Sequence, residues 1–294
     1  EASSGIDLNP LLDRIHHIIR KNETPKPVNP VQKLLRIYMK VAAILLIPLM
    51  VAGALIYSYA SDRQQLIQKE STSAGIFAPM GSRVSFSLPD GTKGMLNSGS
   101  RLDYSVPFTS DRKVKLEGEA WFEVSKDEEH PFEISAGSSV VRVLGTSFNI
   151  SAYPSEKYIE VVLSSGKVEY QSSISEDKVI LGPSERLVCN QGRIHKSVVD
   201  PEKYNAWTEG KLVFRGDPMA EVARRIERWY NVKINIADKE LEKYSFRATF
   251  QDDPLEDVLK FLSMTSPIRF KILKRRSLPD GTFTKEEVTI YKKN

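Results

Sequence analysis

The chain has 294 residues, of which 40% are hydrophobic and 27% are charged. This length allows two modest domains, and the composition excludes a chain that is disordered throughout. The net charge of +4 is concentrated at the front, because residues 1–40 carry +3 and the other 254 residues carry +1. Most of the chain therefore lacks the basic surplus of a nucleic-acid-binding protein, and we expect no direct contact with nucleic acid.

Residues 1–40 are predicted to form a small segment that contains one helix. Asn9 can cap this helix, and proline at the next position suits its first turn. The apolar side chains that follow share one helix face, and they are Leu11, Leu12, Ile15, Ile18 and Ile19. A helix this short cannot bury such a face alone. We expect Leu11, Ile15 and Ile18 to contact a partner or to complete a preceding domain, and the initial Glu, rather than Met, favours the second alternative.

Residues 41–61 contain no charged side chain and are predicted to cross a membrane once, as a helix. At a rise of about 1.5 Å per residue this run spans about 30 Å, the thickness of a bilayer core. Residues 21–40 hold five lysines or arginines and residues 60–79 hold two, which places the N-terminus in the cytoplasm. The alternatives are a buried core helix and a cleaved signal sequence, although the preceding 40 residues are long for such a signal.

Residues 62–78 are polar and rich in serine, and we expect them to form a linker. Over residues 79–200 the pattern changes to short runs such as RVSFSL, KVKLEG, AWFEV and VVRVLG, separated by turn residues. This pattern is typical of an all-β sandwich or barrel-like domain. Within it, LEGEAWFEV places three glutamates and Trp121 on one face of an extended run. We interpret this face as solvated and expect Trp121 to contact a partner or to cover the sheet edge.

Four longer phrases connect this region to a known family. They are LPDGTKGMLNSGSRLDY, RKVKLEGEAWFEVSKDEEHPFEI, VRVLGTSFNISAY and VVLSSGKVEY. In this order and spacing they resemble the periplasmic domain of FecR-type anti-sigma regulators, which implies an all-β FecR-like exported domain. Gly94 and Met95 depart from the family pattern, where larger strand residues are usual, and Ser184 stands where glycine is common.

The phrase VLGTSFN raises the question of self-cleavage. Some FecR-like regulators are thought to cleave themselves at such a Gly-Thr bond, which here joins Gly145 to Thr146. A threonine hydroxyl can attack the preceding carbonyl where the backbone is strained. The alternative, which we favour, is that Gly145 relieves a bulge and Thr146 packs inside the domain. We expect no enzyme, no cofactor and no metal, because the sequence has neither a zinc spacing nor a nucleophile elbow nor a phosphate-binding loop.

The end of the chain contains an internal repeat. VFRGDPMAEVARRIERWYNVKINI and TFQDDPLEDVLKFLSMTSPIRFKI align without a gap at an offset of 36 residues. Each copy reads as a strand, an aspartate that can cap, a proline at the first helical position, an apolar helix stripe and a second strand. With EEVTIYKK as a final strand, residues 204–294 are predicted to form a small α+β domain of two βαβ repeats.

This C-terminal domain resembles the extra domain of many FecR-like proteins and the small domain of secretins and TonB-dependent transducers. The resemblance implies that it docks other proteins. Its candidate contact residues are Trp207, Arg224, Arg228 and Trp229. We interpret the helix face with Arg224, Arg225 and Arg228 as a solvated surface rather than as a nucleic-acid site.

The resemblance implies a single-pass protein of the bacterial inner membrane with its C-terminal bulk in the periplasm. It would relay a signal from a TonB-dependent outer-membrane transducer to a cytoplasmic extracytoplasmic-function sigma factor. The alternative is a membrane-anchored periplasmic adaptor without sigma-factor control, because the family's anti-sigma domains are longer than the 40 residues that precede the predicted span. A membrane-tethered hydrolase would require the self-cleavage considered above.

Overall fold

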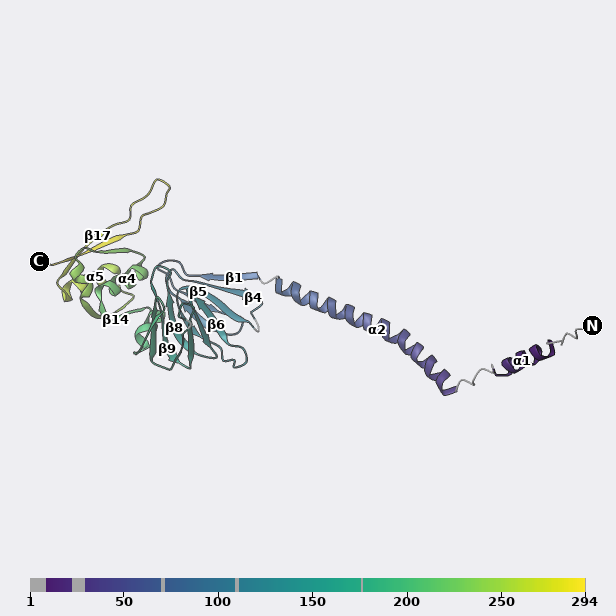
Figure 1. Ribbon diagram of the computed structural model, residues 1–294. Coiled ribbons are helices and arrows are strands. Elements are labelled where there is room, and N and C mark those ends of the chain that lie inside the picture. Colours follow the sequence, from purple (N-terminus) through teal and green to yellow (C-terminus); the bar gives the residue numbers. More distant parts are fainter. Residues whose placement is uncertain (1–8, 23–29, 70–71, 109–110, 176, 294) are drawn as a thin grey trace, which may run out of the picture. The chain divides into compact units, whose positions relative to one another are not determined.

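The computed structural model describes residues 9–22, 30–69, 72–108, 111–175 and 177–293 (Figure 1). The chain divides into two compact units, residues 1–70 and 71–294, and each is described by itself. The first unit holds two helices, α1 (Asn9–Asn22) and α2 (Pro30–Lys69). The second unit holds the other helices, which are α3 (Glu202–Asn205), η1 (Ala206–Glu209), α4 (Met219–Tyr230), η2 (Lys239–Lys243) and α5 (Leu255–Thr265).

The strands also belong to the second unit. The first thirteen form the β lobe, and they are β1 (Thr72–Phe77), β2 (Val84–Ser87), β3 (Lys93–Leu96), β4 (Arg101–Val106), β5 (Arg112–Glu123), β6 (Phe132–Ala136), β7 (Ser139–Val143), β8 (Ser147–Ala152), β9 (Tyr158–Ser165), β10 (Val168–Ser172), β11 (Lys178–Leu181), β12 (Glu185–Asn190) and β13 (Arg193–Val198). The last five form the C-terminal lobe with α4 and α5, and they are β14 (Lys211–Pro218), β15 (Lys233–Ile236), β16 (Ser245–Gln251), β17 (Ile268–Leu273) and β18 (Glu287–Lys292).

The first unit contains the predicted amphipathic helix. The apolar face of α1 is open to solvent, with Leu11, Ile15 and Ile18 exposed by 61%, 46% and 57%. Residues 41–61 lie within α2, which begins earlier and ends later than predicted. Among the residues whose structure is described, no helix is both long and apolar enough to cross a membrane, so the predicted span is not confirmed.

The predicted linker over residues 62–78 is wrong. Helix α2 continues to Lys69, and Thr72–Phe77 form β1, which pairs antiparallel with β4. The physical reason is that an extended polar run becomes a strand when a partner strand offers it hydrogen bonds. The partner, β4, lies some thirty residues farther along the chain, so local composition does not reveal it.

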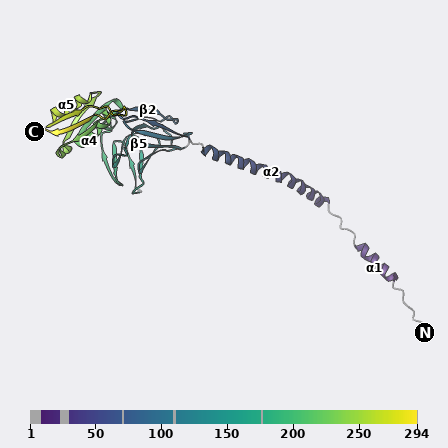
Figure 2. The same ribbon diagram turned by 90° about the horizontal axis from the view of Figure 1, so that it is seen from above.

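The all-β prediction for residues 79–200 is confirmed. The strands of the β lobe form one connected sheet whose main path runs β11-β10-β7-β6-β5-β8-β9-β12-β13. The long strand β5 lies at its centre (Figures 1 and 2). Its residues alternate between buried and accessible positions along its length. Its inward side chains join a core that includes Leu116, Phe122, Phe132 and Phe148. The period of two in the sequence thus reports a sheet with one buried face.

Two departures from the family pattern have structural reasons. Ser184 adopts a φ of 64°, a left-handed conformation that glycine accepts without steric cost. Gly94 lies on β3 beneath the ring of Phe86. A Cβ atom at position 94 would lie 2.4 Å from Phe86 Cζ and 2.5 Å from the carbonyl oxygen of Trp121. A larger residue at position 94 therefore requires the β lobe to move.

We expect Gly94→Ala to lower the free energy of unfolding by about 1–3 kcal/mol, the usual cost of overpacking a core. Urea unfolding of the two proteins measures this difference. Gly182→Ala is the matched control, because a Cβ there would only touch Glu185 Oε2 at 3.6 Å. Equal stability of the Gly94→Ala and Gly182→Ala variants would contradict the prediction.

The C-terminal lobe has the element order that the repeat predicts, including β18 as the final strand. The helix stripes are buried at Val222 and Ile226 in α4 and at Val258 and Leu262 in α5. The predicted strand pairing is corrected, because neither repeat keeps its two strands in one sheet. The first strands, β14 and β16, pair with each other, while the second strands, β15 and β17, flank β18 in another sheet.

The predicted aspartate caps are also wrong. Helices α4 and α5 begin after Pro218 and Pro254, whose extended ψ of 151° places each proline at the N-cap. The carboxylate of Asp217 instead accepts a hydrogen bond from the backbone N–H of Arg215 at 2.8 Å, and Asp253 accepts one from Gln251 at 2.9 Å. Each aspartate thus binds the backbone N–H two residues before it, across the β-bulge of β14 in the first copy and just after β16 in the second.

Candidate functional site

The β lobe and the C-terminal lobe meet through a set of side-chain contacts that we call the lobe seam. It is formed by Arg83, Asn149, Tyr153, Glu156, Trp207, Arg228 and Trp229. Three of these residues, Trp207, Arg228 and Trp229, are predicted from the sequence to contact an outside partner. Their partners in the β lobe were missed, because no local pattern marks them.

Trp207 anchors the short helix η1 in the β lobe. Its side chain is only 2% exposed, and its Nε1–H donates to Asn149 Oδ1 at 3.1 Å. Asn149 Nδ2 in turn donates to Glu119 Oε1 at 2.9 Å, and Asn97 Nδ2 donates to Glu119 Oε2 at 2.8 Å. The prediction that Trp207 contacts an outside partner is therefore wrong in this conformation. Glu119, expected on a solvated face, takes part in this network.

The basic face of α4 packs against the β lobe instead of facing water. The guanidinium of Arg228 pairs with the carboxylate of Glu156, and these side chains are 17% and 5% exposed. Arg228 also lies over the ring of Tyr153, with its guanidinium carbon 4.4 Å from the ring centroid. The guanidinium carbon of Arg83 lies 4.1 Å from the ring centroid of Trp229. The contact with Tyr153 adds to the ion pair among largely buried side chains, whereas Arg83 is exposed.

The other two arginines of this face are held as well. Arg225 donates to the carbonyl oxygen of Val213 at 2.7 Å, and Arg224 pairs with Glu221. The interpretation of this face as solvated is therefore wrong for Arg228, whereas the side chain of Arg224 stays 42% exposed. The physical reason is that a helix pattern shows which side is polar, but it does not show whether a distant segment supplies matching carboxylates.

A charged pocket of about 360 Å³ lies beside the seam. Three ion pairs line it: Arg186 with Glu160, Lys203 Nζ with Asp217 Oδ1 at 2.5 Å, and Arg224 with Glu221. Burial raises the pKa of the Glu160 carboxyl, and the attraction of Arg186 only partly opposes this effect. The pocket thus holds nearly balanced charges that satisfy one another within the chain.

Glu160→Gln is expected to change how stability depends on pH. A carboxyl group whose pKa is raised by folding stabilises the fold fully below its unfolded pKa, and this contribution is lost as pH rises through the folded pKa. The stability of the unmodified chain minus that of Glu160→Gln should therefore fall as pH rises from about 4 towards about 7. Urea unfolding of both proteins at several pH values in this range measures the difference.

Glu185→Gln serves as the control, because its effect on stability should change with pH in the opposite direction. Hydrogen bonds from Lys196 and from the backbone of Gly182 lower the pKa of Glu185. Its contribution is therefore present above the unfolded pKa and is lost as pH falls through the folded pKa. The corresponding stability difference should rise with pH. The same slope in both variants would refute the role assigned to Glu160.

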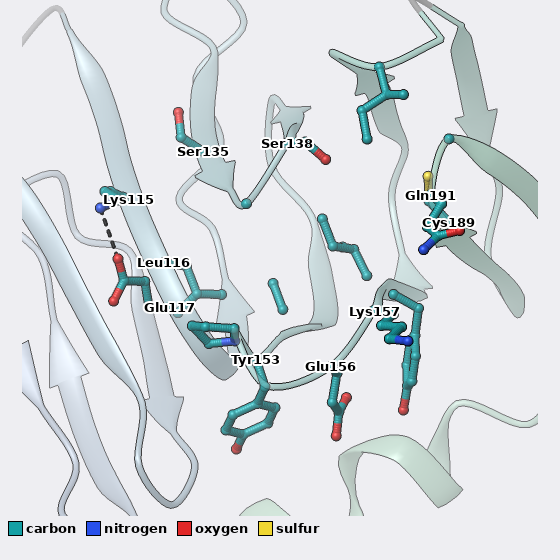
Figure 3. A pocket seen from close by; sticks show the side chains of 17 residues that line it. Lys115, Leu116, Glu117, Ser135, Ser138, Tyr153, Glu156, Lys157, Cys189 and Gln191 are labelled. Carbon is teal, nitrogen blue, oxygen red and sulfur yellow. Dashed lines mark ion pairs between the residues drawn. The ribbon is translucent and has the colours of Figure 1, made fainter.

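A second pocket of about 570 Å³ opens on the β lobe (Figure 3). The ion pair between Lys115 and Glu117 lies on one side of it, and Cys189 and Gln191 lie on the other. Glu156 contributes to the rim, but its carboxylate points away from Ser138 and pairs with Arg228 of the lobe seam. Within the described residues no group of histidine, cysteine and acidic side chains is arranged to hold a metal ion.

The Gly145–Thr146 bond lies in the connection from β7 to β8 and borders a surface cleft of about 720 Å³. Thr146 is only 4% exposed, and its hydroxyl donates to the carbonyl oxygen of Lys167 at 3.0 Å. A Cβ atom at Gly145 would lie 2.9 Å from Lys126 Cα, so this position needs glycine for close approach of two backbones. Packing thus accounts for both residues.

The remaining predicted contact residue is Trp121. It is half-buried on the accessible face of β5 and lines a cleft of about 610 Å³ with Asn205, Lys211 and Arg215. The expectation that it shares a face with the acidic residues of β5 is confirmed. Whether it contacts a partner stays a prediction.

Comparison with known proteins gives matches over both lobes. A family model described as "FecR protein" matches residues 74–169, and one described as "FecR, C-terminal" matches residues 211–278. A crystal structure at 1.65 Å of a "putative anti-sigma factor" from Parabacteroides distasonis is 31% identical, covers 75% of this chain and 100% of its own chain, and has a TM-score of 0.66. A second structure of such a protein from this organism, at 2.50 Å, is 32% identical, with coverages of 76% and 100% and a TM-score of 0.65. No curated protein matches the chain.

Proposed function

The chain belongs to the FecR family, and from this we propose that it is a transmembrane anti-sigma regulator of a bacterial inner membrane. In this proposal the β lobe and the C-terminal lobe lie in the periplasm and receive a signal from a TonB-dependent outer-membrane transducer. The segment before residue 41 holds or releases an extracytoplasmic-function sigma factor in the cytoplasm.

One observation carries the proposal. The similarity to the anti-sigma factor structures includes both lobes and the whole length of those chains. The uncharged run over residues 41–61, with five bases in the twenty residues before it, supports the membrane topology. The exposed apolar face of α1 supports a cytoplasmic partner, because solvent does not stabilise such a face.

The lobe seam suggests how the periplasmic part responds. A transducer can shift a regulator only if it binds one arrangement of the regulator more tightly than another. The contacts of Trp207 and Arg228 join the two lobes through a hydrogen bond and an ion pair, so a partner that competes for these groups can change the relation of the lobes. Altered association or proteolysis then carries the change across the membrane.

The test is to purify the native-length protein from its own cells with a C-terminal tag and to identify its partners. We expect a sigma factor together with an outer-membrane transducer. Leu11→Asp with Ile15→Asp should lose the sigma factor and keep the transducer, whereas His16→Asp with His17→Asp on the polar face of α1 should keep both. Recovery of the transducer without any sigma factor would refute the anti-sigma role and favour a membrane-anchored periplasmic adaptor.

We expect no self-cleavage at Gly145–Thr146. The hydroxyl of Thr146 is buried and already bound to a backbone carbonyl, so it is not free to attack Gly145. The purified protein, incubated alone, should stay one band in electrophoresis, as should Thr146→Ala. A fragment that ends at Gly145, formed by the unmodified chain and absent from the variant, would contradict this expectation.

A further inference from the structure

The strand β17 forms an edge of the three-stranded sheet in the C-terminal lobe. The order of this sheet is β15-β18-β17, and no strand in the described part of the chain pairs with the other side of β17. The N–H of Lys293 donates to the carbonyl oxygen of Pro267, which fixes the phase of the antiparallel ladder. In such a ladder alternate residues bond the neighbouring strand. The N–H and C=O groups of Phe270 and Ile272 therefore point to the open side.

A concentration of positive charge follows this edge. The run from Ile268 to Leu278 contains no acidic residue, and its bases are Arg269, Lys271, Lys274, Arg275 and Arg276. All five side chains are exposed, and none forms an ion pair with any described residue. Elsewhere in this lobe bases such as Lys233 and Lys292 are paired with glutamates. The charge of the run is therefore available to an anionic partner.

Apolar side chains are exposed beside the same strand. Helix α5 packs on β17, and its Phe261 and Met264 are 42% and 77% exposed. Along β17 itself, Phe270 and Ile272 face the helices, while Arg269 and Lys271 face the solvent side of the sheet. A strand added here would place alternate side chains against an apolar helix and against a row of bases.

The loop between β17 and β18 continues this surface. Figure 1 shows residues 274–286 as a long excursion from the lobe, closed by a bridge between Ser277 and Phe283. Phe283 is 66% exposed, and Arg276 lies on the strand-like limb opposite it. The combination of exposed apolar and basic side chains thus extends beyond β17.

We propose that β17 binds an extended segment of a protein partner by strand addition, and that this segment alternates acidic and apolar residues. Main-chain hydrogen bonds to Phe270 and Ile272 provide the attachment, and the bases select the acidic side chains. A second copy of this chain does not suit the edge, because two β17 strands would bring like charges together. The proposal goes beyond the relay function and depends on neither a sigma factor nor a membrane.

The test uses the full solubilised chain and a fluorescent peptide of about ten residues in which glutamate alternates with valine. Fluorescence anisotropy should show binding that weakens as salt concentration rises. Lys271→Glu with Lys274→Glu should weaken binding at least about tenfold, which corresponds to about 1.4 kcal/mol. Lys239→Glu with Lys243→Glu, an equal charge change at exposed bases of η2, should leave it unchanged.

A peptide whose backbone nitrogens are methylated distinguishes strand addition from charge attraction alone. It keeps the glutamates but loses the N–H donors, so we expect it not to bind. Equal binding of the methylated peptide would overturn the proposal. An equal loss of affinity in the two charge variants would also overturn it, and so would a failure of the original peptide to bind. Tighter binding of duplex DNA or of vesicles that contain phosphatidylserine would also overturn it, in favour of a polyanion-binding surface.

Discussion

Trp207→Ala is expected to lower the free energy of unfolding by about 3–5 kcal/mol, the usual cost of truncating a buried tryptophan. The side chain is 2% exposed in the β lobe although it belongs to the segment that leads into the C-terminal lobe. Its removal leaves a cavity and takes the Nε1–H donor from Asn149. Because Trp207 joins the two lobes, its removal weakens the attachment between them and also lowers the stability of the whole protein.

Two measurements check this prediction. Calorimetry should show the C-terminal lobe of the variant melting at a lower temperature than the β lobe, and limited proteolysis should cut more readily near residues 199–206. Trp207→Phe is the matched control, because it keeps an aromatic ring at this position and loses the Nε1–H donor and only part of the ring volume, so its cost should be smaller, about 1–2 kcal/mol. A change below about 1 kcal/mol in Trp207→Ala would show that the seam does not depend on this residue.

Arg228→Ala is expected to lower the free energy of unfolding by about 3–5 kcal/mol, the range for breaking a buried ion pair by removing one partner. The carboxylate of Glu156 is 5% exposed and would lose its counter-charge. The other oxygen of this carboxylate, Oε2, is already buried without a hydrogen-bond partner, so no second contact within the described chain relieves the loss. Chemical unfolding of the purified protein measures the effect.

The double variant Arg228→Met with Glu156→Gln tests the reason for this cost. It removes both charges and keeps similar shapes, so it should recover most of the lost stability. Arg215→Ala is the matched control, because Arg215 and Asp200 form an ion pair whose side chains are 42% and 46% exposed. Exposed pairs of this kind contribute about 1 kcal/mol or less. An equal cost for Arg215→Ala and Arg228→Ala would refute the special role of the seam.

The repeat shows how far local sequence patterns reach. The apolar stripes of α4 and α5 and the strands around them follow from side-chain periods, which depend only on backbone geometry. The pairing of those strands does not follow. Whether β14 joins β15 or β16 depends on how the two helices share one core, and that choice is made between segments far apart in the sequence.

The lobe seam shows the same limit for function. Trp207, Trp229 and the arginines of α4 stand out in the sequence because exposed aromatic and basic residues favour protein contacts. Their contacts lie within the chain, and Glu156 and Asn149 carry no motif that identifies them. No sequence period relates residue 156 to residue 228, so this pairing is visible only after folding.

The sequence by itself determined the amphipathic helix α1, the strand-rich lobe, the repeated C-terminal lobe and the family, because each depends on local periods or on ordered phrases. Tertiary structure alone decided that residues 72–77 form a strand, that Arg228 of α4 is covered and that β17 has an open edge. Each of these features depends on whether another segment of the chain lies beside the residues concerned. Such relations arise from packing between distant parts of the chain, which neighbouring residues do not encode.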